Sequence, residues 1–533
     1  MISGNDLWKK YAAYELEPVK VSSSRSIDTY PGLPESLYTA FSQTAARIPE
    51  KTAVADDCGH VSSYKDLLQK TDSFSSWLRY NTKIEKGAHV AVMMYNSLEF
   101  CTAFLALNKL GAVVIPLQTK YRRPEINALL SKTEVSLILT DPQFAGWFSS
   151  YKESGQAQVI SCFDIHAGYG WEGFEDPRPC EITGGRFDDA LLVFTSGTTS
   201  RSKGVVIKNY NIMHAAASYQ KTLQITEQDV TVIPIPLYLI TGLIALFGLF
   251  MYTGGTVYIQ QFFNAKEVLS CVREHHITFV HASPTVFSLL LDEAAGFPSL
   301  PSLKKFACGS SNMPKEKIRQ LHRWLPQSSF HTVYGLTETT SPGTIFPEDA
   351  SESPYIGSSG IPIPGMSVKI LREDGTEAAP GEQGEVLLCG ANLLDRYYQM
   401  DTPLLKDNWL NTGDIGYLNE DGYLYIVDRK KDMINRGGEK VTSFDVENEI
   451  YQIPGVLDAA VVGIPSEKYG EVPAALIRVG KDFSMTQEDL RVFLKKRLAS
   501  YQVPEYIRFV QEIPVTPNNK IDKKYIRTHF NEL

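Results

Sequence analysis

The stretch Thr195-Ser196-Gly197-Thr198-Thr199-Ser200-Arg201-Ser202-Lys203-Gly204 directly follows the apolar run from Ala190 to Phe194. Its small residues let backbone N–H groups approach an anion closely, its hydroxyls add donors, and Lys203 adds a positive charge. These are the properties of a loop that holds phosphate oxygens at the end of a strand. A flexible Ser/Gly linker is the alternative, but a linker has no need to follow a buried strand.

A second alternative is a degenerate nucleotide-binding P-loop, because Gly197 and Lys203 have the spacing of that motif. Two positions depart from it. Ser202 occupies the second glycine position, and Gly204 replaces the Ser/Thr whose hydroxyl holds the metal ion. The loss of that hydroxyl weakens the interpretation as a kinase or NTPase.

Composition limits the class of protein. The chain has 533 residues, enough for two to four domains, and 43% of them are hydrophobic. Its net charge of −9 and the lack of a basic patch give no support for nucleic-acid binding. The cysteines are seven in number and scattered, and none lies in a C-x-x-C pair, which indicates a reducing, cytoplasmic location without structural zinc. They are Cys58, Cys101, Cys162, Cys180, Cys271, Cys308 and Cys389.

One segment has the length and apolar character of a membrane span. Residues 232–252 carry no charge, but Pro234, Pro236, Gly242 and Gly248 interrupt them. A loop followed by a buried helix is therefore the favoured interpretation, and we expect no membrane span. The N-terminus shows no apolar core of a signal peptide.

Strand-like and helix-like segments alternate over most of the chain, which predicts a largely parallel sheet covered by helices. The expected strands are 88–94, 112–116, 135–140, 230–234, 256–259 and 279–282, and the expected helices are 98–110, 125–132 and 265–274.

The texture changes near residue 350, where short strands and tight turns indicate a small antiparallel β subdomain. After the charged run 428–432, about 100 residues alternate by themselves, as expected for a small α+β domain. We therefore predict an α/β protein with a large N-terminal domain of parallel and mixed sheets, residues 1–430, and a small mobile C-terminal domain, residues 431–533. The segments expected in these two parts are strands 367–372, 384–390, 423–428, 457–463, 472–479 and 507–509, and helices 443–451 and 486–498.

Several further motifs accompany the phosphate-type loop. Tyr334-Gly335-Leu336-Thr337-Glu338 follows an apolar strand and offers an aromatic plane, a hydroxyl and a carboxylate. Asn411-Thr412-Gly413-Asp414 has the composition of a turn, which we expect to present the Asp414 carboxylate. Arg429, residues 437–440 and residues 516–520 complete the set. Each motif is weak alone, whereas their order and spacing together are specific.

That order resembles the adenylate-forming superfamily, which includes acyl-CoA synthetases, aryl-acid ligases, peptide-synthetase adenylation domains and luciferases. The resemblance runs from about residue 40 to the end of the chain. Lesser motifs at 63–67, 110–117 and 500–504 support it.

The resemblance implies a role for each matching residue. Glu338 is expected to bind Mg²⁺ and Thr337 to touch the α-phosphate, while Lys520 bridges the substrate carboxylate and the α-phosphate. Lys431 matches the hinge of the small domain, and Gly437, Gly438 and Lys440 match the segment that serves the CoA thioester step. The remaining ATP contacts are implied at Thr195, Ser196, Gly197, Thr198, Thr199, Lys203, Gly309, Ser310, Ser311, Tyr334, Asp414 and Arg429.

The acid pocket is the least defined part of the implied site. Many CoA ligases carry an aromatic-His pair where this chain has Tyr238-Leu239, and amino-acid-activating domains carry an Asp at the Leu239 position. Leu239 cannot pair with a substrate ammonium, and an unpaired buried ammonium is costly, so an α-amino acid substrate is disfavoured. An apolar pocket is expected from Tyr238, Leu239, Thr241, Gly242, Ala307 and Leu336.

Other departures from the family pattern lie in two loops. Ser200 and Ser202 replace the usual Gly and Pro, and Asn519 replaces the common Gly before Lys520. Since Ser tolerates positive φ less well than Gly, the conformation of the first loop can differ from that of relatives.

The sequence therefore predicts an AMP-forming acid–thiol ligase that uses ATP, Mg²⁺, a small carboxylic acid and CoA. A separate carrier protein stays open as the thiol acceptor. Because the sequence ends 13 residues after Lys520, we expect no fused carrier domain. Three rivals also remain: an oxygen-dependent luciferase, a non-catalytic nucleotide-binding protein and a phosphotransferase.

Overall fold

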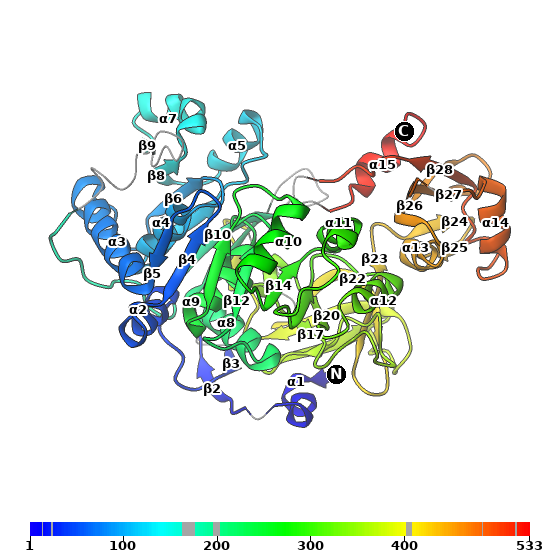
Figure 1. Cartoon of the computed structure of the whole chain (residues 1–533), viewed down its shortest axis with the longest axis horizontal. Helices are drawn as coiled ribbons and strands as arrows, with labels where there is room; N and C mark the ends of the chain where they lie inside the picture. Colours follow the sequence, from blue (N-terminus) through cyan, green and yellow to red (C-terminus); the bar gives the residue numbers. More distant parts are fainter. Residues whose placement is uncertain are drawn as a thin grey trace.

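Apolar strands and the helices between them build the large domain of the protein, and a smaller C-terminal domain lies beside it (Figure 1). The computed structural model describes residues 1–12, 14–22, 25–161, 176–195, 203–400, 408–481, 483–516 and 520–533.

The first layer of the large domain is a seven-stranded sheet whose central strands are almost entirely buried. Its five central and edge strands β10, β7, β6, β8 and β9 run parallel, as predicted for βαβ units. In sheet order the strands are β21 (Arg396–Tyr397), β11 (Lys203–Lys208), β10 (Asp189–Thr195), β7 (Val113–Pro116), β6 (His89–Met93), β8 (Val135–Thr140) and β9 (Gln158–Ser161).

The second layer is a nine-stranded sheet with a parallel centre and short antiparallel strands at both edges. In sheet order the strands are β18 (Ile361–Pro362), β17 (Thr344–Ile345), β16 (Ser329–Tyr334), β15 (Lys305–Cys308), β14 (Phe279–Ala282), β12 (Val230–Ile233), β13 (Thr256–Ile259), β4 (Thr52–Asp56) and β5 (Val61–Ser63).

Helices cover these sheets and join their strands. All of α4 (Leu98–Lys109) is buried, which its apolar composition on every face explains. Ser63 caps α3 (Tyr64–Trp77) in a capping box with Asp66. The other helices of the large domain are α1 (Gly4–Leu7), α2 (Leu37–Arg47), α5 (Arg123–Leu130), α6 (Pro142–Ala145), α7 (Ser149–Glu153), α8 (Asn209–Leu223), α9 (Leu249–Thr253), α10 (Ala265–Glu274), α11 (Pro284–Asp292) and α12 (Lys315–Trp324).

The apolar segment 232–252 forms the end of β12, a loop, a buried π-helical segment from Thr241 to Gly248, and α9. Within the described residues, no helix has both the length and the apolar character required to cross a membrane. The prediction of a proline-containing loop before a buried helix is confirmed.

The predicted β subdomain is a five-stranded antiparallel sheet of β1 (Ile2–Ser3), β19 (Met366–Leu371), β20 (Gly384–Gly390), β22 (Leu410–Leu418) and β23 (Leu424–Arg429). The prediction of a turn at 411–414 is wrong, because these residues belong to β22. Gly413 has a φ of +72°, and three residues of β22 stand opposite one residue of β20. The turn-like composition therefore makes a bulge inside a strand. A separate hairpin pairs β2 (Glu17–Lys20) with β3 (Ser26–Thr29).

The C-terminal domain has its own apolar core around Ile434, Val461 and Ile477. The three predicted strands and two predicted helices are present; helix 443–451 has the predicted bounds, and the bounds of the other four differ by a few residues. Its elements are β24 (Ile434–Arg436), β25 (Glu439–Val441), α13 (Ser443–Tyr451), β26 (Val456–Ser466), β27 (Gly470–Val479), α14 (Gln487–Lys495), β28 (Tyr506–Val510) and α15 (Lys523–His529).

Candidate active site

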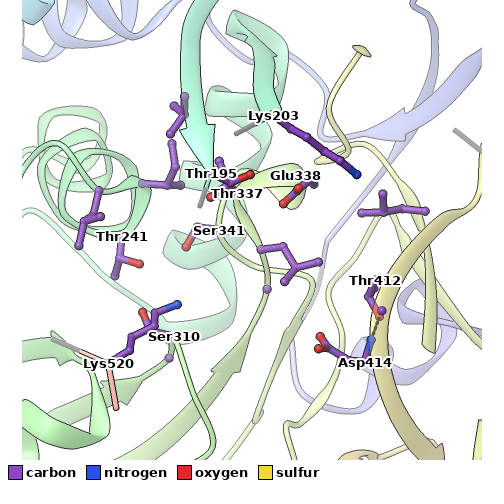
Figure 2. Close-up of a pocket in the computed structure, with 18 of the residues that line it drawn as sticks. Thr195, Lys203, Thr241, Ser310, Thr337, Glu338, Ser341, Thr412, Asp414 and Lys520 are labelled. Atoms are coloured by element: carbon purple, nitrogen blue, oxygen red, sulfur yellow. Dashed lines mark hydrogen bonds between the residues drawn. The ribbon is translucent and has the colours of Figure 1, made fainter. Parts of the chain in front are cut away.

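A cavity of about 660 Å³ opens where the two domains face each other, and most of the predicted motifs meet in it. Strand ends and loops of both large sheets line it, together with β22 and β23 and two residues of the C-terminal domain, Lys431 and Lys520. Figure 2 shows Thr195, Lys203 and Glu338 towards one end of this cavity and Asp414 with Thr412 towards another.

The first end of the cavity lies between β10 and β11. Thr195, the last residue of β10, and Lys203, the first residue of β11, are direct cross-strand partners. Lys203 therefore starts a strand, although its sequence context suggested a loop. The Lys203 Nζ lies 5.2 Å from the centre of the Tyr397 ring. The predicted phosphate contacts Ser196, Gly197, Thr198 and Thr199 lie outside the described residues.

Thr337 and Glu338 enter the same end of the cavity from a single 3₁₀ turn after β16. The hydroxyl of Tyr397 donates a hydrogen bond of 3.1 Å to Oε1 of Glu338. Gly335 makes this turn possible, since a Cβ at that position would lie 1.5 Å from the carbonyl oxygen of Ser341. The two predicted catalytic side chains are thus held in place by a close backbone approach.

The other end of the cavity centres on the buried Asp414. The Tyr334 hydroxyl donates to its Oδ2 at 2.7 Å, and Nε of Arg429 lies 3.3 Å from its Oδ1. Asp414 and Arg429 are also cross-strand partners of β22 and β23. Burial raises the pKa of Asp414, while Arg429 and the Tyr334 hydrogen bond oppose that rise. The carboxylate is therefore held by two partners from different sheets.

The predicted adenine segment lies on the loop after β15. Gly309 and Ser310 line the cavity, and Ser310 has a φ of +73°. Ser311 is exposed and is not among the lining residues. Tyr334 contributes through its bond to Asp414, while its neighbour Gly335 forms the wall.

Lys520 brings a cation from the C-terminal domain into the cavity. Thr516 fixes its turn, because the Thr516 N–H donates to the Lys520 carbonyl at 2.7 Å and the Lys520 N–H donates to Oγ1 of Thr516 at 3.3 Å. Burial, together with Arg429 and Lys431, lowers the pKa of Lys520 to about 8. Lys431, the predicted hinge, lies in the turn between β23 and β24 and lines the same cavity.

The predicted acid pocket is only partly as expected. Tyr238, Leu239, Thr241 and Leu336 line the cavity, whereas Gly242 and Ala307 do not. Ala307 is buried within β15. A Cβ on Gly242 would lie 2.5 Å from the Pro236 carbonyl oxygen, so this glycine serves loop packing.

Sequence reasoning missed three polar residues of this wall, Gln118, His281 and Ser341. His281 lies in the apolar β14 and Gln118 just beyond β7, both at the carboxyl end of a parallel strand. That position was the available signal, because ligands of α/β proteins bind at this edge of the sheet.

The segment predicted for the thioester step lies away from the cavity. Lys440 forms an ion pair with Glu373 of the large domain, and both side chains are exposed. The Gly437 N–H donates to the Tyr469 carbonyl at 2.8 Å, and the Gly438 N–H donates to Oδ1 of Asn435 at 3.1 Å. This orientation of the C-terminal domain therefore presents Lys520 to the cavity and keeps Lys440 outside it.

Polar contacts across the domain boundary accompany this orientation. The Arg478 guanidinium lies 3.2 Å from Oδ2 of Asp292 at the end of α11, and 2.6 Å from Oδ2 of Asp458 in its own domain. The N–H and hydroxyl of Ser443 both donate to Oδ2 of Asp428 at 2.7 Å. The first contact joins segments far from the hinge, so it depends on how the domains are turned.

No group of three or more His, Cys, Asp or Glu side chains positioned to hold a metal ion occurs in the described residues. A Mg²⁺ ion that is bound mainly by substrate phosphates and water needs only one or two protein carboxylates. Glu338, next to the Thr195–Lys203 pair, fits that requirement.

Comparison with known proteins identifies the class. The sequence profile of the AMP-binding enzymes matches residues 41–398, and that of the AMP-binding enzyme C-terminal domain matches residues 445–520. The chain belongs to the AMP-binding enzyme family.

Individual relatives agree with this assignment. A 2-succinylbenzoate–CoA ligase of Bacillus licheniformis is 31% identical, over 90% of this chain and 97% of its own. The structure of the o-succinylbenzoate CoA synthetase of Bacillus subtilis with its acyl-adenylate intermediate has a TM-score of 0.80 at 28% identity, over 92% of this chain and 97% of that one. The same synthetase in complex with ATP and magnesium ion gives a TM-score of 0.79, over 91% and 98% of the two chains.

Proposed function

We propose that the protein is an ATP-dependent carboxylic acid–CoA ligase that acts through an acyl-adenylate and releases AMP and pyrophosphate. The observation that carries this proposal is the position of Lys520. It reaches from the C-terminal domain into the cavity that Thr337, Glu338 and Asp414 line from the large domain. The likeness to CoA ligases over nine-tenths of the chain supports the same reaction.

In the first half-reaction, a carboxylate oxygen of the acid attacks the α-phosphorus of ATP. The new O–P bond forms as the bond between the α-phosphorus and the bridging oxygen breaks, and pyrophosphate leaves with the electron pair. Two anions must approach each other, so cations and donors aimed at this centre supply most of the catalysis. Lys520 serves the carboxylate and α-phosphate, Thr337 the α-phosphate, and Lys203 with Thr195 the leaving phosphates.

Asp414 accepts the ribose hydroxyls, with Tyr334 and Arg429 holding its carboxylate in place. Gly309 and Ser310 border the adenine, and Tyr334 acts through its hydrogen bond to Asp414. Glu338 would hold the Mg²⁺ ion, which neutralises phosphate charge when it is bound. The closed arrangement of Lys520 over the cavity excludes water from the reactive mixed anhydride.

In the second half-reaction, the CoA thiol sulfur attacks the acyl carbon, the thiol proton leaves, and AMP departs with the electrons of the C–O bond. The observed orientation leaves Lys440, Gly437 and Gly438 outside the cavity. We therefore assign this step to a second orientation of residues 431–533, reached by rotation at Lys431. The domain boundary accordingly falls between residues 430 and 431.

A cytoplasmic location belongs to the same proposal, because the scattered cysteines favour a reducing compartment.

Pyrophosphate release with a panel of carboxylic acids, in the presence and absence of CoA, tests the proposal. AMP, pyrophosphate and an acyl-CoA are the expected products. ADP in place of AMP would identify a phosphotransferase, and ATP binding without turnover of any acid would identify a nucleotide-binding protein. If the acyl-adenylate reacts with the phosphopantetheine of a carrier protein but not with CoA, the thiol acceptor is the carrier protein.

A further inference from the structure

We infer that His281 is a specificity-determining residue that selects acids bearing an uncharged oxygen group, a hydroxyl or a carbonyl, in addition to their carboxylate. This inference rests on the proposed ligase function and deepens it by naming the class of acid. It starts from two hydrogen-bonding atoms that are buried at the cavity without a partner.

His281 is 1% exposed and lines the cavity. Among the described residues, neither its Nδ1 nor its Nε2 has a hydrogen-bond partner. The other buried histidines of the large domain differ in this respect. His214 pairs with Thr29 at 2.8 Å and with the Pro364 carbonyl at 3.0 Å, and His331 pairs with Ser329 and with the Phe346 carbonyl, both at 2.9 Å.

A buried polar group without a partner is destabilising, and such groups in native proteins call for a water, an ion or a ligand. The surroundings of His281 point to a ligand. The aromatic rings of Tyr219 and Phe279 pack at centroid distances of 5.7 and 6.3 Å. Gly309, which also lines the cavity, brings no side chain towards Nε2; a Cβ there would lie 3.4 Å away, in van der Waals contact. The imidazole therefore combines two aromatic neighbours with a place in the lining of the cavity.

The charge state of the imidazole selects the kind of ligand atom. Burial lowers the pKa of His281 to about 3, so the ring is neutral at physiological pH. A neutral imidazole carries one N–H donor and one acceptor nitrogen. A hydroxyl complements both, and a carbonyl complements the donor. A plain hydrocarbon tail forms a hydrogen bond with neither nitrogen, so both stay buried without a partner.

His281 shares the cavity with Lys520 and Thr337, which serve the carboxylate end, and with Tyr238 and Leu239. An acid in the cavity meets several polar groups, among them Gln118, Ser341 and Tyr238, whose hydroxyl also lacks a hydrogen-bond partner in the described residues. His281 differs from them because it presents two ring nitrogens that both lack a partner there. A site built to hydrogen-bond a substrate oxygen discriminates strongly against the analogue that lacks it.

Matched pairs of acids test the inference by kcat/KM for pyrophosphate release. Suitable pairs are 4-hydroxycinnamate and cinnamate, 4-hydroxyphenylacetate and phenylacetate, and 8-hydroxyoctanoate and octanoate. For pairs that are turned over, the wild-type protein should prefer the oxygenated member by about tenfold or more, the factor that corresponds to one buried hydrogen bond. His281→Phe should remove this preference, chiefly by reducing use of the oxygenated member, and His281→Gln, which keeps a donor and an acceptor, should restore part of it.

The readout is the ratio within a pair, which general damage to the fold leaves unchanged. His275→Phe, at an exposed histidine outside the cavity, is the matched control and should keep the wild-type ratio. Turnover of acids without a preference for the oxygenated member, or a preference that survives in His281→Phe, overturns the inference and leaves the ligase function intact. The absence of pyrophosphate release with every acid overturns the ligase function itself.

Discussion

The Tyr334 hydroxyl donates a 2.7 Å hydrogen bond to Asp414, and this bond joins the nine-stranded sheet to the β subdomain at the floor of the cavity. Tyr334 ends β16, whereas Asp414 lies in the bulge of β22. The carboxylate that we propose as the ribose contact is thus fixed by two sheets whose residues lie about 80 positions apart in the sequence.

Tyr334→Phe should raise KM for ATP by about 10- to 100-fold, because a hydrogen bond to a charged group contributes about 1.5–3 kcal/mol. Loss of the donor also raises the pKa of Asp414 further, so the acid limb of kcat/KM for ATP should move to higher pH. Tyr355→Phe is the matched control, since Tyr355 donates an equally short bond to the exposed Asp421. An unchanged KM in Tyr334→Phe would remove Asp414 from nucleotide binding.

Lys520→Ala should slow acyl-adenylate formation by about 10²–10⁴-fold, the range for loss of one donor to a transition-state charge. Thioester formation from supplied acyl-adenylate should survive, because that step is assigned to the other orientation. Single-turnover measurements of each half-reaction separate the two. Lys524→Ala, an exposed lysine four residues away, is the control. Equal loss in both half-reactions would contradict the division of labour.

Adenylation should also lose activity at alkaline pH. Lys520 has a pKa of about 8 and acts as a cation, so the active form is present below that pH and is lost as pH rises through it. The profile of kcat/KM for adenylation should therefore fall above about pH 8. Lys520→Arg, whose guanidinium stays charged, should move this limb to higher pH, and a limb that persists unchanged would assign the titration to another group.

Asp292→Asn should shift the balance between the two domain orientations. It removes the charge that meets Arg478 across the boundary, while Arg478 keeps its partner Asp458. A partly exposed ion pair contributes at most about 1 kcal/mol, so adenylation should slow by about two- to fivefold, with thioester formation unchanged or faster. Glu35→Gln breaks a pair with Arg186, both residues belonging to the large domain, and should alter neither half-reaction.

Amino acids should give no pyrophosphate release above background, because Leu239 offers a substrate ammonium no counter-charge. Leu239→Asp should depress the use of acids with apolar tails by burying a charge at the wall. Leu239→Asn separates polarity from charge and should have the smaller effect. A wild-type protein that prefers any common α-amino acid to every other acid in the panel would overturn this assignment.

Local patterns predicted the elements well, because each depends on neighbouring residues. Strands 135–140, 256–259 and 279–282 and helix 265–274 have the predicted bounds. The errors arise where tertiary context decides. Residues 411–414 have the composition of a turn, but their strand is paired with a neighbouring strand on each side. Gly413 therefore lies in a bulge within β22 and not in a turn.

The residues of the candidate site were likewise predicted only in part. Order and spacing gave Thr195, Lys203, Glu338, Asp414 and Lys520, which all line the cavity. His281 was missed because the other residues of β14 are apolar or small, so the segment has the pattern of an ordinary core strand. Only the order of the strands in the sheet shows that the end of β14 faces the cavity. The outward position of Lys440 depends on the domain orientation, which no local pattern encodes.

The pairing of β1 with β19 has a consequence for the order of assembly. Ile2 lies opposite Val368, so the β subdomain takes one edge strand from the beginning of the chain and its neighbour from beyond the second large sheet. Such a contact of high sequence separation closes a long loop and forms late. During synthesis on the ribosome, residues 2 and 3 cannot pair with β19 until most of the large domain has emerged. We expect most of the two large sheets to fold before β1 pairs with β19.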